Sequence, residues 1–178
     1  MLKAASLGLA LAMMASAASA ADLITYPTST HEQVPVATRG AMDWNGFYAG
    51  IYGTGRNSAS HGTQYGGGID LGVNTTFNFV LVGAEVSVEG LTGGNGSTSY
   101  AKALGRGGIL LGGNTLVYGA AGYGIDTGTP NENDILAGGG LEYALTDNVS
   151  IRAQYLHGFP AVGASPKNEV TLGAQFHF

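Results

Sequence analysis

The chain has 178 residues, of which 31 are glycine and only 11% are charged, and its formal net charge is −5. This composition fits one domain, is too rich in glycine for an ordinary helical protein, and lacks the basic footprint of a nucleic-acid-binding protein. The absence of cysteine excludes disulfides, thiolate zinc sites and cysteine nucleophiles.

The N-terminus predicts export. Lys3 precedes an apolar run over residues 4–15, and Ala18, Ser19 and Ala20 form an A-x-A site. These are the features of a cleaved secretory signal peptide, which we place at residues 1–20. A membrane anchor is the weaker reading, because a spanning helix needs about 20 apolar residues. The mature chain would carry a charge of −6, from six Lys and Arg against twelve Asp and Glu.

Residues 21–43 contain Pro27 and Pro35 and no sustained hydrophobic period, so we expect a flexible periplasmic leader. From Trp44 the pattern changes to alternating apolar and small or polar residues, which predicts β-strands. The first strand begins at Trp44, with Phe47, Ala49 and Ile51 on one face and Tyr48, Gly50 and Tyr52 on the other. Further strands are expected over about 69–74, 80–88, 100–111, 115–125, 135–145, 149–157 and 170–178.

The connections between these strands alternate in length. Long polar loops are predicted over residues 55–66, 89–99, 126–134 and 157–168, and short turns over 75–78, 112–114 and 146–148. The turn at 146–148 joins the strands at 135–145 and 149–157. If the apolar residues of both strands share one face, the turn takes three residues and Glu142 lies directly opposite Arg152. Asn148 is suited to a left-handed position in this turn. The faces of the strand at 115–125 cannot be assigned, because turns of two and three residues give opposite answers.

Eight strands of about 9 to 11 residues with alternating long and short connections match a small transmembrane barrel. We therefore predict an all-β, eight-stranded antiparallel up-and-down transmembrane β-barrel over residues 44–178. The alternative is a soluble barrel of the lipocalin kind, which would enclose its apolar face and expose its charges.

Two patterns favour the membrane. The strand charges balance three against three, as expected for side chains that compensate one another inside a lumen; this lumen charge network comprises Asp70, Glu85, Lys102, Arg106, Glu142 and Arg152. We expect Glu142 to pair with Arg152, and Glu85 to pair with Lys102. Aromatic residues also gather at the strand ends that share the short turns, as in an interfacial girdle: Trp44, Phe47, Phe77, Phe79, Phe176 and Phe178. Candidates for the opposite rim are Tyr65, Tyr100, Tyr123 and Tyr155.

The segments Trp44–Gly50 and Leu141–Asn148 and the terminal Phe178 resemble the OmpA-type barrel domain of alphaproteobacterial outer-membrane immunogenic proteins. The resemblance spans about residues 44–178. It implies insertion by the barrel assembly machinery, with Phe178 as the assembly signal, contact with outer-membrane lipid and lipopolysaccharide, and surface loops that meet the outside world. The loops here are short and rich in glycine, and no peptidoglycan-binding domain follows, so anchorage to the cell wall is not supported.

Catalysis has little support in the sequence. The four histidines, His31, His61, His157 and His177, show no metal-ligand spacing such as H-E-x-x-H. His157 has Ser165 and Glu169 beyond it, but nucleophilic hydrolysis needs the base within hydrogen-bond reach of the nucleophile. Barrel lipid A deacylases carry a His-x-Ser pair, and here Gly158 and Phe159 follow His157. Glycine runs such as 66–68 and 138–140 lack the helix that a phosphate-binding loop feeds.

We accordingly predict a structural outer-membrane protein that is not an enzyme, has no catalytic residues, cofactor or metal, and has no nucleic-acid partner. The alternatives are a narrow passive channel and a soluble periplasmic ligand-binding barrel. The sequence identifies no partner for the loops and no oligomeric state.

Overall fold

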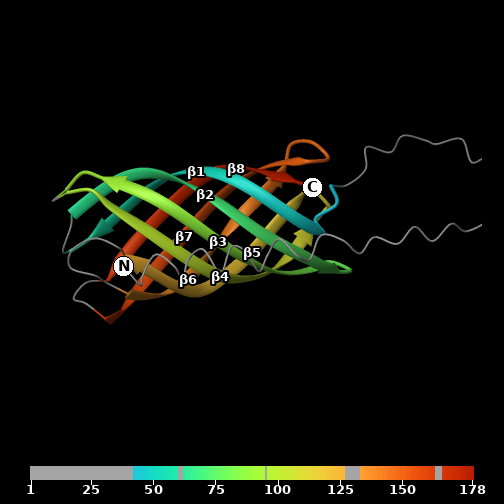
Figure 1. The fold of residues 1–178 in the computed structure, drawn as a ribbon. Helices are drawn as coiled ribbons and strands as arrows, with labels where there is room; N and C mark the ends of the chain where they lie inside the picture. The colour runs from blue at the N-terminus through green and yellow to red at the C-terminus, as the bar shows by residue number, and fades with distance from the viewer. Residues whose placement is uncertain (1–41, 60–61, 95, 127–132, 163–165) are drawn as a thin grey trace, which may run out of the picture. The chain divides into compact units, whose positions relative to one another are not determined.

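The computed structural model describes residues 42–59, 62–94, 96–126, 133–162 and 166–178. Eight strands form one closed antiparallel barrel in chain order, with β8 paired to β1 (Figure 1). The strands are β1 (Gly46–Ser58), β2 (Gly62–Phe77), β3 (Val80–Thr92), β4 (Thr98–Leu111), β5 (Thr115–Asp126), β6 (Asn133–Ala144), β7 (Val149–Val162) and β8 (Lys167–His177). The predicted fold class is therefore confirmed. The part of the chain that is described holds no helix long and apolar enough to cross a membrane.

The strands are longer than predicted and the loops shorter. Strand lengths run from 11 to 16 residues, and β1 continues to Ser58 before β2 begins at Gly62, so most of the loop expected at 55–66 is strand. The loops expected at 89–99, 126–134 and 157–168 shrink in the same way, because β3, β6, β7 and β8 extend beyond their predicted bounds at this end. Residues 1–41, which contain the predicted signal peptide and nearly all of the predicted leader, lie outside the described residues.

The strand pairing fixes the stagger of the barrel. A line of paired residues starts at Tyr48 in β1 and passes once through every strand to Lys167 in β8. Lys167 is paired with Ser58, so the line returns to β1 ten residues further along. This stagger tilts the strands about the barrel axis, as closure of a sheet requires, and it brings residues far apart in sequence to the same level of the lumen.

The short turns fix which face each strand presents to the lumen. Glu142 lies opposite Arg152, as predicted. The turn at 112–114 has three residues, since Leu111 pairs with Thr115, and this directs Leu116, Tyr118 and Ala120 of β5 into the lumen. The expectation for Asn148 is wrong: of the described non-glycine residues only Asn78, in the turn between β2 and β3, has a positive φ, of 57°. Asn148 instead donates its side-chain amide to the carbonyl of His177.

Lumenal tyrosines account for part of the high glycine content. A Cβ added at Gly72 would lie 2.2 Å from the ring of Tyr48, and one added at Gly124 would lie 2.0 Å from the hydroxyl of Tyr100. Each ring lies over the bare backbone of a neighbouring strand. Glycine therefore provides the space in which large side chains fit inside a narrow barrel.

Candidate functional site: the polar lumen and the apolar outer surface

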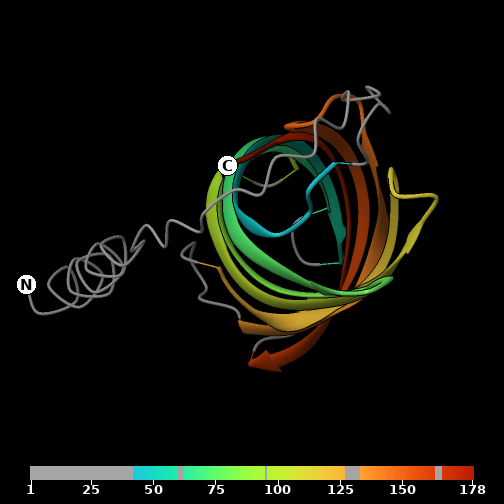
Figure 2. The ribbon, with the colours of Figure 1, turned by 90° about the vertical axis from the view of Figure 1, so that its right-hand side faces the viewer.

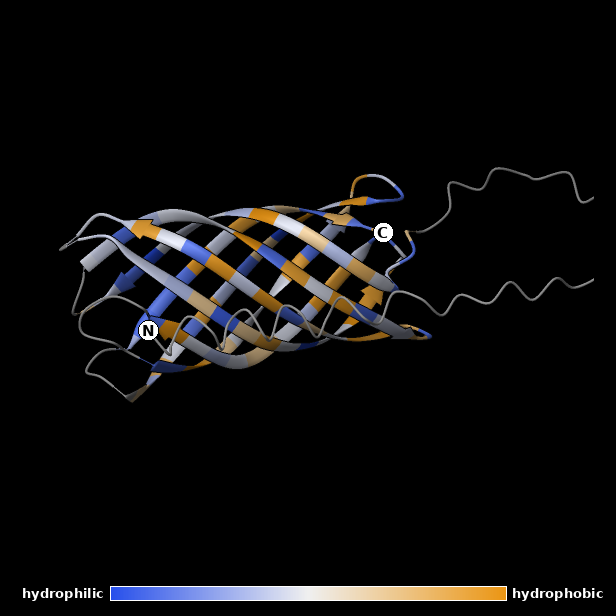
Figure 3. Cartoon of the chain, in the orientation of Figure 1, coloured by the Kyte–Doolittle hydropathy of each residue, from blue (hydrophilic) through white to orange (hydrophobic). Residues whose placement is uncertain are grey.

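The barrel has its apolar face outside. Large apolar side chains along all eight strands are exposed, and they alternate with inward polar residues (Figure 3). All five Lys and Arg residues of the described chain are buried inside: Arg56, Lys102, Arg106, Arg152 and Lys167. This polarity suits a barrel surrounded by lipid, and it is the reverse of a soluble ligand-binding barrel.

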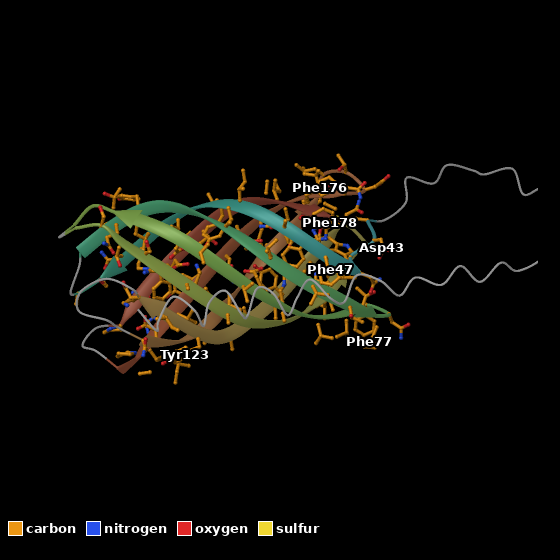
Figure 4. The ribbon with its side chains drawn as sticks, viewed as in Figure 1. Asp43, Phe47, Phe77, Tyr123, Phe176 and Phe178 are labelled. Atoms are coloured by element: carbon orange, nitrogen blue, oxygen red, sulfur yellow. The ribbon has the colours of Figure 1, made fainter. Side chains whose placement is uncertain are left out.

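Five of the six predicted girdle aromatics face outward at the turn side of the barrel. Phe47, Phe77, Phe176 and Phe178 gather there in Figure 4, and Phe178 is the most exposed at 73%. Phe79, in the β2–β3 turn, is exposed as well. The assignment of Trp44 is wrong, because its side chain is 2% exposed.

Two of the four candidate tyrosines lie at the opposite rim as expected. Tyr65 and Tyr123 are exposed near the loop-side ends of β2 and β5, and Figure 4 places Tyr123 at the end away from the phenylalanines. Tyr155 is exposed as well, but it lies near the middle of β7. The assignment of Tyr100 to this rim is wrong, because its side chain is buried in the lumen and its hydroxyl donates a hydrogen bond to Asp134 at 2.7 Å. Tyr100 shares the parity of Lys102 and Arg106 along β4, and this parity places it inside.

The six residues of the predicted lumen charge network are all buried inside the barrel. Five of them form what we name the turn-side cluster: Asp70, Glu85, Arg106, Glu142 and Arg152. Arg152 contacts Asp70 at 2.7 Å and Glu85 at 2.5 Å, and Arg106 contacts Glu142 at 2.7 Å and Glu85 at 3.4 Å. The Tyr48 hydroxyl donates to Glu85 and accepts from Arg106, so hydrogen bonds complete a network that joins six strands.

The two expected ion pairs are wrong. Glu142 and Arg152 are strand partners, yet Glu142 pairs with Arg106 and His177, and Arg152 reaches across the lumen to β2 and β3. Lys102 pairs with Glu89 and Glu169 rather than with Glu85. Long side chains in a narrow lumen reach across it, so adjacency in the sheet does not determine the pairing.

A second cluster was missed in the sequence because it lies in strand ends that were predicted as loops. This loop-side cluster consists of Arg56, Glu89, Lys102 and Glu169. Arg56 pairs with Glu89 and with Glu169, the latter at 2.6 Å, while Lys102 bonds to the same two carboxylates. The guanidinium of Arg56 also lies 3.8 Å from the ring centroid of Tyr100.

Further toward the loops, Lys167 contacts Asp134 at 2.9 Å and Asp126 at 3.8 Å. The described lumen thus holds five Lys and Arg against seven Asp and Glu. The expected balance of three against three does not describe the whole set, which is more acidic than basic.

Ser150, His177 and Glu142 meet at the turn side, but their geometry does not suit hydrolysis. The Ser150 hydroxyl donates to Glu142 at 2.6 Å, and Nε2 of His177 lies 3.2 Å from both Ser150 and Glu142. A catalytic triad places nucleophile and acid on opposite ring nitrogens, whereas here both contact the same one. His157 contacts Asn168, Glu169 lies in the lumen, and Ser165 is not among the described residues. No cluster of metal-ligating side chains occurs in the part of the chain that can be described.

Comparison with known proteins identifies the fold. A scan against family models and a search of curated sequences find no match. Several solved structures are similar. The attachment invasion locus protein Ail of Yersinia pestis has a TM-score of 0.57 at 13% identity, with 75% of this chain and 97% of Ail covered. The neisserial surface protein A gives 0.55 at 15%, with 74% and 97% covered. The N-terminal β-barrel domain of Pseudomonas aeruginosa OprF gives 0.51 at 15%, with 72% and 97% covered. At these identities the similarity concerns the fold, which is that of small outer-membrane barrels.

Proposed function

We propose that this chain is an exported structural protein of the bacterial outer membrane, of the OmpA type and akin to the alphaproteobacterial immunogenic barrels. It supports the envelope and presents surface loops. The observation that carries the proposal is the polarity of the barrel: apolar side chains line the outside, and every described Lys and Arg is enclosed. A folded protein exposes this much contiguous apolar surface when that surface meets lipid or a partner.

The lumen favours a closed barrel over a passive channel. Eight strands leave an interior that side chains can fill, and here the two charge clusters span it from β1 to β8. A soluble ligand-binding barrel is the weaker alternative, because its apolar face would lie inside, where this chain has its charges.

The proposed partners follow from the outer surface. The last strand ends with Phe176 and Phe178 exposed and in edge contact at 5.3 Å, which suits an assembly signal read by the barrel assembly machinery. Contact with lipopolysaccharide would use acyl chains and neutral groups, because the exterior of the described barrel carries no Lys or Arg. One neighbour, Ail, has been solved with a heparin analogue. The connections between the strands of this chain contain no Lys or Arg to bind such a polyanion.

Cell fractionation followed by gels of boiled and unboiled samples tests the proposal. A heat-modifiable band in the outer-membrane fraction is the expected result, because a closed barrel resists unfolding by detergent until it is heated. Recovery of the protein in the soluble periplasmic fraction would contradict the proposal.

A further inference from the structure

The mouth of the barrel on the turn side is crossed by the residues that precede β1. In Figure 2, which faces this mouth, the short cyan segment before β1 runs across the opening. Its apolar side chains, Met42 and Trp44, are 4% and 2% exposed, and they belong to the same hydrophobic cluster as Leu81, Leu116 and Ala144 of the lumen wall. A layer without charge therefore closes this end.

Specific hydrogen bonds hold the segment in place. The indole nitrogen of Trp44 donates to the carbonyl of Gly113, in the β4–β5 turn, at 2.9 Å. The side chain of Asn45 accepts hydrogen bonds from the backbone nitrogen and the hydroxyl of Thr76, at 2.7 and 2.8 Å. Asp43 in turn accepts from the backbone and side chain of Asn45, which lowers the pKa of the Asp43 carboxyl. The segment is thus attached to the β4–β5 turn and to the turn-side end of β2.

The layer lies directly over polar groups. Trp44 meets the ring of His177 edge-on at 5.6 Å, and His177 contacts Glu142 of the turn-side cluster. Within the described residues, several buried polar atoms at this level have no protein partner: both side-chain atoms of Asn74, Oε1 of Gln175, Oδ1 of Asp70 and Nε of Arg106. Buried atoms of this kind are ordinarily satisfied by enclosed water. Water held here would be separated from the outside solution by Met42 and Trp44.

We propose that residues 42–45 form a stopper that closes the turn-side mouth and shields the polar lumen behind it from solution. The ion pairs fill the lumen, and the stopper controls access to it from one end. The stopper continues directly into β1 at Gly46, so displacement of Met42 and Trp44 from the lumen wall opens this mouth. The inference rests on the proposed function in one respect: that the solution at this mouth is the periplasm.

The single tryptophan of the chain permits a direct test. Full-length protein refolded into vesicles is exposed to acrylamide in water or to lipids brominated in their acyl chains. A tryptophan in the stopper is quenched weakly by both agents. Strong quenching by the brominated lipids would place Trp44 in the girdle, and strong quenching by acrylamide would mean that the mouth is open; either result overturns the proposal. A matched control moves the indole to the lipid face, in a Trp44→Phe, Phe47→Trp variant, which brominated lipids should quench strongly.

A second test measures access to the lumen. Ser150 lies in the lumen behind the stopper, and the chain has no cysteine, so Ser150→Cys introduces a single, nearly isosteric reporter. The labelling rate with a small charged methanethiosulfonate is measured on purified barrel in detergent, so the result does not depend on where the protein resides in the cell. Adding Trp44→Ala should raise the rate by about tenfold or more, because labelling follows local opening.

Adding Phe47→Ala, which removes an exposed aromatic next to the stopper, should leave the labelling rate unchanged. Equal rates with and without Trp44 would overturn the proposal. If Trp44→Ala loses its heat-modifiable mobility, Met42→Ala takes its place and the same increase is expected.

Discussion

At the residue scale, the central question is how charged side chains are accommodated inside the barrel. Each buried carboxylate of the turn-side cluster contacts at least one guanidinium, and Glu85 contacts two. Removing one partner from such a network costs more than the pair is worth, because an uncompensated charge stays buried. Arg152 is the most sensitive position, since it contacts both Asp70 and Glu85.

Replacing Arg152 by Met should lower the free energy of unfolding by about 3–5 kcal/mol, measured as a shift of the urea midpoint of the barrel in vesicles. The double variant Asp70→Asn, Arg152→Met should lose less unfolding free energy than the sum of the losses of the two single variants. The reason is that Asp70→Asn removes one of the two carboxylates that Arg152→Met leaves without this guanidinium. An unchanged urea midpoint for Arg152→Met would mean that the contacts of Arg152 contribute nothing to the stability of the barrel.

Two glycines in the adjacent strands β4 and β5, Gly107 and Gly122, should respond differently to replacement by alanine. A Cβ at Gly122 would lie 2.0 Å from the carbonyl oxygen of Ala103, whereas one at Gly107 would meet nothing closer than 3.9 Å. Gly122→Ala should therefore destabilise by about 1–3 kcal/mol through overpacking. Gly107→Ala should stabilise by about 0.4–1 kcal/mol by restricting the unfolded chain. Urea titrations of the two variants, run in parallel, measure both effects. Equal midpoints would argue against the close approach of position 122 to the carbonyl oxygen of Ala103.

At the element scale, the alternation of side chains made most of the fold predictable. Apolar and polar residues alternate in seven strands clearly enough to assign their faces, and the pairing of Glu142 with Arg152 across β6 and β7 followed from parity alone. The strand ends were less visible. Near the loops many of the outward residues, such as Gly55, Asn57 and Thr92, are glycine or polar, so the alternation of apolar residues weakens although Arg56, Glu89 and Glu169 keep pointing inward.

Parity would also have corrected the placement of Tyr100, which lies two residues from Lys102 in β4 and so belongs to the inward set. It could not have corrected Trp44, because Trp44 precedes β1 and the alternation of side chains holds only within a strand. Ion-pair partners could not be predicted in this way. They depend on the ten-residue stagger of the barrel, which determines which side chains meet across the lumen and which no single hairpin reveals.

The outward face of a strand should tolerate charge according to depth. Val86 is exposed at the centre of β3, and Thr92 is exposed at its loop-side end. Val86→Arg should destabilise the barrel in vesicles by about 2–4 kcal/mol, and Thr92→Arg by about 0–1 kcal/mol. Equal effects of the two substitutions would show that β3 does not cross the apolar layer in this orientation.

At the scale of the whole molecule, the filled lumen and the closed mouth predict little conductance. Purified protein in planar bilayers should give no large, steady single-channel current. Any residual leak should favour cations, because the described lumen holds seven Asp and Glu against five Lys and Arg. Steady large currents would support the passive channel instead, and an anion preference would contradict this account of the lumen charge.

The contact between Arg56 and Glu169 has a consequence for how the barrel is completed. The two residues are direct partners across the junction of β1 and β8, and 113 positions separate them in the chain. A slip of one residue at this junction would turn the charges of one strand toward lipid and the apolar side chains toward the lumen. The pair therefore forms only when the first and last strands meet in the native register, and a closure that is misaligned by one residue loses this contact as well as the burial of its charges.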